Sequence, residues 1–373
     1  MKINGSSLSW VIPIIFGLIM ILPSCKQGKN EKKTYCTQDD FKKMEKIDIH
    51  CHISVERHTF MELAVADNFR ILTINTDAFL HPTIEEQQEF ALKQIKAFPK
   101  NLHYLTAFNL KGWDEPGWQE KTIAYLDDSF KKGAIGIKVW KNIGMVEKDK
   151  NGKFIMIDDP KFDPIFDYLE KRNMPVCGHL GEPKNCWLPI EKMTVNNDKK
   201  YFAEHPEYHM FLHPEYPSYE DQIAARDNML RKHPNLRFMG AHLGSLEWSV
   251  DELAKHFDMF PNMAVDMAAR TCHIEKQAQA DWQKVHDFFI KYQDRIIYGT
   301  DEGDFEGAPA DPLKLKEQVE TVWTRDWKFL TTDENELLTL WLADKVMEVL
   351  EGENELVGKA LEQMYASCGK TNF

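Results

Sequence analysis

The chain contains no CxxC pair, although it has seven cysteines. Thiolate zinc sites are usually built on such pairs, so this spacing argues against one. Positive charge is also in short supply: 46 Lys and Arg residues stand against 59 Asp and Glu residues, and the formal net charge is −13. An acidic chain of this kind argues against a nucleic-acid partner and against long-range steering of anionic substrates.

The first 25 residues are predicted to be a targeting segment outside the fold. Lys2 gives a short positive region, and the apolar run from Trp10 to Leu22 is too short to span a membrane as a mature helix. The run ends in Leu-Pro-Ser-Cys25, which resembles a bacterial lipoprotein signal with Cys25 as the lipidated residue. An ordinary signal peptide or a retained membrane anchor is the alternative.

A polar stretch follows, and residues 26–40 are expected to form a flexible tether. The protein would then be held on a membrane by lipid, on the periplasmic or cell-surface side, without spanning it.

Eight apolar, strand-like segments alternate with helix-like segments along the rest of the chain. We expect strands at 45–52, 70–76, 102–110, 135–141, 174–181, 236–244, 262–269 and 295–301, and helices at 83–98, 117–132, 161–172, 218–233, 247–258 and 276–292. Continuous apolar runs are typical of parallel strands buried on both faces. Eight such units predict a single (β/α)₈ TIM barrel over residues 41–373, with helices near 333–351 and 353–366 packed outside it. Cys51 and Cys177 fall on these strands, where a buried free thiol is the expected state.

Two insertions interrupt the alternation. Residues 146–158 follow the fourth strand and contain Asn151-Gly152, a hairpin turn signal. Residues 182–217 form an extended loop after strand five that is rich in aromatic residues, including Trp187. This loop is interpreted as a lid over a ligand, or as an insertion that packs on itself or makes a contact between subunits of a homo-oligomer.

Polar residues stand at the ends of several predicted strands. His50 and His52 lie two apart, so their side chains point to the same side of the first strand. His179, His242 and Asp301 end strands five, six and eight. Barrel active sites lie at this end of the strands, and neutral imidazoles with a carboxylate suit Zn²⁺ or a related divalent ion.

The segments IDIHCHI, GIKVW, CGHLGEP, GAHLGS and YGTDEG carry a family resemblance. Their order resembles the amidohydrolase superfamily, and most closely its amidohydrolase-related branch. That branch includes hydrolases and the aminocarboxymuconate-semialdehyde-decarboxylase-like enzymes. The resemblance extends from about residue 44 to residue 303.

The resemblance implies roles for the strand-end residues. His50, His52, His179 and Asp301 would be metal ligands or near-ligands, and Asp301 would also act as general base or proton shuttle. His242 would bind a second metal or orient the substrate and the attacking hydroxide.

Lys138 on the fourth strand has two interpretations. In binuclear relatives a lysine on this strand is carbamylated and bridges two metals. As an ordinary lysine it would bind a substrate carboxylate or pair with Asp301. We expect a single ion, with two ions if Lys138 is carbamylated.

Four further residues are candidate contacts to the metal shell or the substrate. Glu182 follows His179 by three residues and would support the metal shell. Arg270 follows strand seven and would bind an anionic substrate group, with a surface ion pair as the alternative. Trp140 and Trp187 are candidate substrate contacts.

Together these residues predict a metal-dependent hydrolase of a small-molecule amide, lactone or ester. A metal-dependent non-oxidative decarboxylase is the alternative within enzymes, since both reactions use the same histidine pair. A surface protein that captures a ligand with a non-catalytic barrel is the alternative outside enzymes.

Overall fold

The computed structural model describes residues 35–79 and 81–332. Contacts divide the chain into two compact units, Met1–Tyr35 and Cys36–Phe373, and all described helices and strands belong to the second. Cys25 and the helices expected at 333–351 and 353–366 lie outside the described residues.

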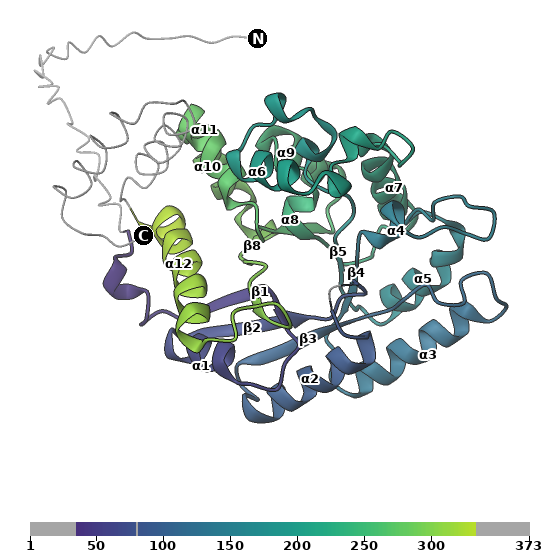
Figure 1. Cartoon of the computed structure of the whole chain (residues 1–373), viewed down its shortest axis with the longest axis horizontal. Coiled ribbons are helices and arrows are strands. Elements are labelled where there is room, and N and C mark those ends of the chain that lie inside the picture. The colour runs from purple at the N-terminus through teal and green to yellow at the C-terminus, as the bar shows by residue number, and fades with distance from the viewer. Residues whose placement is uncertain (1–34, 80, 333–373) are drawn as a thin grey trace, which may run out of the picture. The chain divides into compact units, whose positions relative to one another are not determined.

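The described residues form one sheet of nine parallel strands (Figure 1). The strands are β1 (Lys46–Ile53), β2 (Phe69–Ile74), β3 (Leu102–Ala107), β4 (Ile137–Val139), β5 (Val176–Gly178), β6 (Phe238–Gly240), β7 (Met263–Asp266), β8 (Ile296–Ile297) and β9 (Gly303–Asp304). Consecutive strands pair from β1 to β8, and the short β9 pairs with the other edge of β1. The predicted α/β fold with consecutive parallel strands is confirmed, with nine strands in place of the expected eight.

The sheet curls so that its last strands return to its first. Ile49 N donates to Tyr298 O at 3.2 Å, and Asp301 N donates to His50 O at 2.8 Å. The segment that follows β8 therefore runs beside β1, and the carboxyl ends of distant strands come together at one rim.

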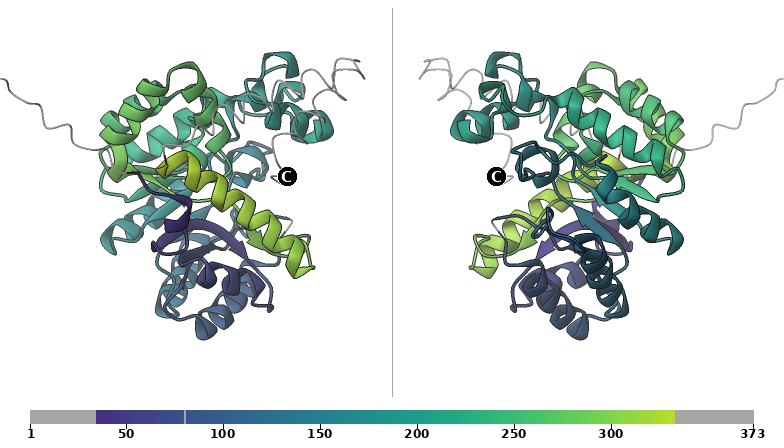
Figure 2. Two further views of the ribbon diagram at one scale, coloured as in Figure 1. Left: turned by 90° about the vertical axis from the view of Figure 1, so that its left-hand side faces the viewer. Right: turned by 90° about the vertical axis from the view of Figure 1, so that its right-hand side faces the viewer.

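Helices connect the strands, and most of the longer ones cover the outer face of the sheet (Figures 1 and 2). They are α1 (Thr59–Ala66), α2 (Ile84–Ala97), α3 (Trp118–Lys131), α4 (Asn142–Met145), α5 (Asp163–Lys171), α6 (Asn196–Glu204), α7 (Tyr219–Lys232), α8 (Ala241–Gly244), α9 (Val250–Met259), α10 (Thr271–Ala280), α11 (Trp282–Tyr292) and α12 (Pro312–Thr331). The helix expected over 276–292 is two helices, because Asp281 is extended (φ −154°) and its carboxylate accepts from Lys284 N as the N-cap of α11.

Helix α12 was not predicted from the sequence. It begins with Asp311 as N-cap and Pro312 in its first turn, a common start signal. Leu315, Val319 and Trp323 recur every four residues and pack into the apolar cluster around β1 and α1. This packing places α12 against the first strands (Figure 2).

The N-terminal edge of the unit overlaps the expected tether of residues 26–40. Cys36 N donates to Thr331 O at 3.0 Å, and Trp327 Nε1 donates to Thr37 O at 3.1 Å. Residues from 36 onward are thus fastened to α12.

The insertion after β5 has a small core of its own. Cys186, Met193, Phe202 and Met210 are buried together with Met145. This packing agrees with the alternative in which the insertion packs on itself.

The cysteines on the strands have the expected state, since Cys51 and Cys177 are buried and free. Among the described helices, none combines the length and the apolar character needed to cross a membrane.

Candidate metal centre

A cavity of about 220 Å³ lies at the rim where the strands end. Its walls include most of the side chains predicted to act there: His50, His52, Lys138, Trp140, His179, His242 and Asp301. They come from β1, β4 and the segments directly after β4, β5, β6 and β8. The curled sheet thus brings together residues that are up to about 250 positions apart in the chain.

His50 and His52 extend from the same side of β1, with ring centroids 5.4 Å apart. His50 Nδ1 lies 2.8 Å from Asp266 Oδ2, and His52 Nδ1 lies 2.9 Å from Ile74 O. Their Nε2 atoms lie 3.3 Å and 3.2 Å from Asp301 Oδ1. One donor atom from each of these three residues thus falls within 4.8 Å of the others.

Asp301 faces this pair from a left-handed backbone position, with φ of 71°. Burial alone would raise the pKa of its carboxyl, but the surrounding histidines outweigh burial and hold that pKa well below its usual range. The carboxylate is therefore ionised at neutral pH.

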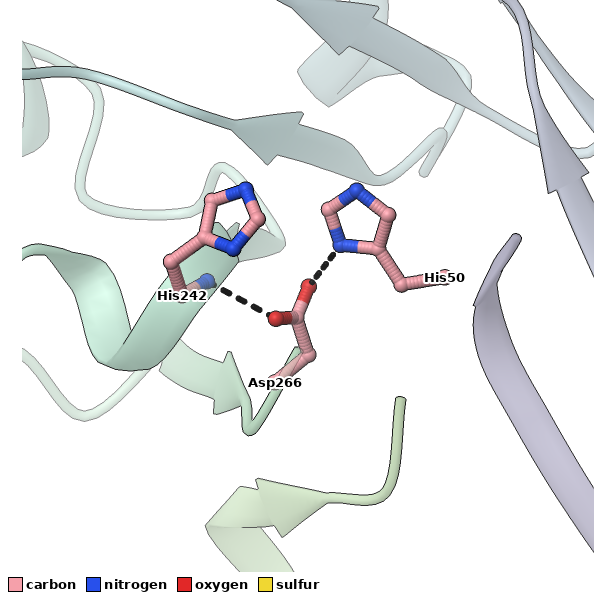
Figure 3. A group of neighbouring side chains, drawn as sticks. All are labelled: His50, His242 and Asp266. Carbon is pink, nitrogen blue, oxygen red and sulfur yellow. Dashed lines mark hydrogen bonds and ion pairs between the residues drawn. The ribbon is translucent and has the colours of Figure 1, made fainter. Parts of the chain in front are cut away.

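His242 approaches from the other side and is fastened by Asp266 (Figure 3). Its backbone N donates to Asp266 Oδ1 at 2.8 Å, and its Nδ1 lies 2.8 Å from Ala268 O. Burial opposes ionisation of Asp266, yet His50 and His242 beside it lower its pKa to about 2. One ionised carboxylate thus holds the His50 ring and the His242 backbone together.

His179 completes the group of imidazoles. Its ring centroid lies 4.2 Å from that of His242, which in turn lies 4.8 Å from that of His50. His179 Nε2 is buried and has no hydrogen-bond partner among the described residues. A buried nitrogen without a partner is costly, so it points to a ligand at this position.

Lys138 is 1% exposed, as expected for a side chain that faces the interior. Its Nζ lies 3.2 Å from His50 Nε2 and 3.6 Å from Cys177 Sγ. No ion pair with Asp301 is present among the described residues.

The donor set fits a divalent cation. Carboxylate and carbonyl oxygens only accept, so Nδ1 of His50, His52 and His242 carries the proton and Nε2 carries the lone pair. Burial lowers the pKa of His50 and lowers those of His179 and His242 well below the usual value. Neutral rings with Nε2 lone pairs directed at one cavity, beside an ionised carboxylate, are a suitable set for Zn²⁺ and related ions.

The four weaker candidates lie in different places. Trp140 lines the cavity, and Glu182 forms an ion pair with Lys141 and lies 3.9 Å from His179 Nε2. Trp187 and Arg270 are not among the residues that line it. Trp187 packs on Tyr219 in the insertion, and Arg270 Nη1 donates to Ala269 O.

Three titratable residues of the centre were not predicted from the sequence. Asp266 fastens two of the histidines, and its position at the end of β7 was the available signal. His81 and Lys141 line the cavity, His81 from the loop after β2 and Lys141 from the segment after β4. Burial, with His52 close by, lowers the pKa of His81 to about 4.

The family model described as amidohydrolase matches residues 47–346 of the chain. This chain belongs to the amidohydrolase family. Its match covers the whole sheet except Lys46, the first residue of β1, and it includes every residue that lines the metal cavity. Amidohydrolases are typically metal-dependent, in agreement with the donor set found here.

Solved structures of low sequence identity resemble this amidohydrolase. One is 2,6-dihydroxybenzoate decarboxylase from Rhizobium, with 14% identity, a TM-score of 0.47, and 79% of this chain and 94% of that chain covered. Another is a probable 2-pyrone-4,6-dicarboxylic acid hydrolase from Acinetobacter baumannii, with 12% identity, a TM-score of 0.41, and 78% and 97% covered. No curated protein matches the chain with significant sequence similarity.

Proposed function

We propose that this amidohydrolase is a metal-dependent hydrolase that cleaves an amide, lactone or ester of a small molecule. The proposal rests on one observation: neutral imidazole Nε2 atoms and one ionised carboxylate converge on a single cavity. The cavity volume of about 220 Å³ suits a small substrate.

His50, His52, His179 and Asp301 would hold the ion, and Zn²⁺ is the metal expected for such donors. When bound, the ion supplies a Lewis acid for a carbonyl oxygen and activates water for attack. We propose one ion, with Lys138 unmodified beside it; a carbamylated Lys138 would instead bridge two ions.

Asp301 would accept the proton of the attacking water, because its carboxylate is ionised and lines the cavity. The same carboxyl would then return that proton to the leaving nitrogen or oxygen, so that the side chain ends the cycle as it began. His242 would orient the attacking water, which donates a hydrogen bond to the Nε2 lone pair. Lys138 and Trp140 would contact the rest of the substrate.

The test is a metal analysis of the purified full chain, followed by a screen of lactones, amides, esters and aromatic carboxylates. We expect one ion per chain and turnover of a carbonyl substrate without release of carbon dioxide. Release of carbon dioxide would replace the proposal with non-oxidative decarboxylation. Less than stoichiometric metal together with no turnover would favour a non-catalytic ligand-binding barrel.

We further propose that the curled sheet is the closed (β/α)₈ barrel of this family, and that lipid on Cys25 holds the protein on the outer side of a membrane. The support for the anchor is the Leu-Pro-Ser-Cys25 ending of the apolar run. Cys25→Ala should release the protein from the membrane fraction. A variant that still sediments with membranes would favour a retained helical anchor.

A further inference from the structure

The chain makes an unusual turn directly after β6, in the four-residue segment α8, where His242 and Leu243 do not have helical φ and ψ angles. Four successive residues, His242 to Ser245, have positive φ angles of 57°, 58°, 62° and 58°. Three of them are not glycine, and L-residues disfavour this left-handed region because Cβ approaches the following carbonyl oxygen. Such a run persists only where its surroundings hold it.

Two glycines let the chain make this turn. A Cβ on Gly240 would lie 2.7 Å from Gly244 Cα, so the two ends of the turn are in direct backbone contact. A Cβ on Gly244 would lie 3.4 Å from Arg226 Nη1. The spacing in Gly-Ala-His-Leu-Gly thus admits both the turn and a guanidinium beside it.

Arg226 on α7 is the charged group that holds the turn. It is 1% exposed, and its Nη1 donates to Gly244 O. Its Nε and Nη2 donate to Asp227 Oδ1 at 3.0 Å and 2.8 Å, and Asp227 Oδ2 lies 3.3 Å from His256 Nε2. The guanidinium is therefore neutralised on one side and directed at a backbone carbonyl of the turn on the other.

Helix α7 fastens the same turn at a second point. Tyr219 OH donates to Ser245 O at 2.6 Å and accepts from Trp248 Nε1 at 2.8 Å. Arg226 and Tyr219 lie on one helix, so the turn is held against a rigid element.

The first residue of the turn carries the imidazole. The His242 ring lies between those of His179 and His50, at centroid distances of 4.2 Å and 4.8 Å. A small rotation of the turn would move His242 Nε2 away from the cavity, because the ring is attached to a residue whose own backbone is left-handed.

We infer that Arg226 is a positioning residue of the metal centre: its guanidinium holds the left-handed turn and thereby sets where His242 Nε2 lies. This inference rests on the proposed function, since it assigns Arg226 a role through His242. Arg226 itself does not line the cavity.

The test is a double-mutant cycle between Arg226→Met and His242→Ala in the full chain. Three readouts apply: zinc affinity by chelator competition, the visible absorption of the Co²⁺-loaded protein, and kcat/KM once a substrate is known. His242 is not one of the proposed metal ligands, but its ring packs against those of the ligands His179 and His50, and loss of such a neighbour lowers metal affinity or activity by about 10-fold to 100-fold. We expect Arg226→Met to shift zinc affinity, the Co²⁺ spectrum and kcat/KM in the same direction as His242→Ala. The double variant should be no worse than His242→Ala alone, because the two residues act as one unit.

Arg295→Met is the matched control. The Arg295 guanidinium also donates to backbone carbonyls, those of Met263 and Phe260, but Arg295 lies directly before β8, at the end of the strand away from the rim. This variant should lower the midpoint of thermal unfolding. Its zinc affinity should stay within about twofold of the wild-type value, and its Co²⁺ absorption spectrum should match that of the wild type.

Additive losses in the cycle, or equal effects of Arg226→Met and Arg295→Met on zinc affinity and the Co²⁺ spectrum, would overturn the inference and leave the proposed function standing. If Arg226→Met does not fold, Arg226→Lys takes its place. A lysine offers one ammonium for two acceptors, so an intermediate loss is expected, and wild-type values would overturn the inference. A wild-type protein that binds neither Zn²⁺ nor Co²⁺ would overturn both proposals.

Discussion

Two regions of the centre present their side chains in different ways. His50 and His52 stand on β1, an eight-residue extended strand, and simple alternation places both rings on one side. His242 and Asp301 stand on left-handed residues just past β6 and β8, strands of three and two residues. The difference teaches that the backbone of a long strand directs its ligands to one side, whereas the backbone that follows a short strand is itself held by groups from elsewhere in the chain.

Buried polar groups hold the left-handed residues in place through hydrogen bonds. Arg226 and Asp266 hold the turn that carries His242. Asp48 holds the segment that carries Asp301: its carboxylate accepts from Thr300 N at 3.1 Å and from Thr300 Oγ1 at 2.7 Å. Trp323 Nε1 on α12 donates to the same carboxylate at 3.2 Å, and burial raises the pKa of Asp48 to about 6. These costly buried groups are used where the backbone cannot position a side chain alone.

The largest effect is expected when one of the proposed metal ligands on β1 is removed. His52→Ala should lower zinc affinity by more than about 100-fold and abolish turnover, since even outer-shell partners cost about 10-fold to 100-fold. The barrel should stay folded, because His52 contributes one hydrogen bond, to Ile74 O, outside the cavity. Metal content by elemental analysis and circular dichroism would check both outcomes.

His103→Ala is the control for that experiment, since His103 is an exposed histidine on β3. It should keep full metal content. A folded His52→Ala protein with wild-type stoichiometry would remove His52 from the metal ligands.

A smaller effect is expected for Asp266, which contacts His50 in one region and His242 in the other. Asp266→Asn keeps an oxygen for His242 N but offers an amide NH₂ to His50 Nδ1. That donor would force the His50 proton onto Nε2 and remove its lone pair from the cavity. Zinc affinity should fall by about 10-fold to 100-fold, measured by chelator competition.

Asp304→Asn serves for comparison, because Asp304 is equally buried but pairs with Arg57 and not with the histidines. It should change stability and leave zinc affinity in place. Equal affinity losses in the two variants would show that burial of the carboxylate matters, and not its bond to His50.

Substitution of Lys138 tests how far the histidines on β1 depend on the ammonium group beside them. Lys138→Met keeps the apolar stem and removes the ammonium that lies 3.2 Å from His50 Nε2. We expect activity to fall by about 10-fold to 100-fold while one ion per chain stays bound. Two ions in the native protein, both lost in the variant, would show instead that Lys138 is carbamylated and bridges them.

The comparison also explains what could be predicted from the sequence. Alternation and strand ends sufficed for His50, His52 and Lys138, because period two is visible in the sequence. The roles of Arg226 and Asp48 could not be read, since each acts on a segment distant in the chain and looks like an ordinary helix or strand residue. The run of left-handed residues could not be predicted either, because a leucine such as Leu243 rarely adopts a positive φ angle.

The short strands also explain why some strand bounds were predicted wrongly from the sequence. Strands were expected to extend over 236–244 and 295–301, but β6 and β8 cover only part of each range, and the remainder turns to present His242 and Asp301. Apolar character predicts burial, and both a strand and a buried turn satisfy it.

The smallest effect is expected for the two tryptophans, which were predicted alike and lie in different places. Trp140 lines the cavity from the segment after β4, whereas Trp187 packs on Tyr219 with a centroid distance of 5.6 Å. Both side chains are half-buried, so replacing each with phenylalanine makes a matched pair. An aromatic contact is worth about 0.5–1.5 kcal/mol, so Trp140→Phe should raise KM by about twofold to tenfold. Trp187→Phe should leave KM unchanged and alter only the unfolding free energy, because its ring contacts the insertion's own core. Steady-state kinetics on the substrate found by the screen, with urea unfolding of both variants, would measure the two effects. A rise in KM for Trp187→Phe equal to that for Trp140→Phe would mean that the insertion closes over the substrate. The prediction that only the tryptophan at the rim contacts substrate would then be wrong.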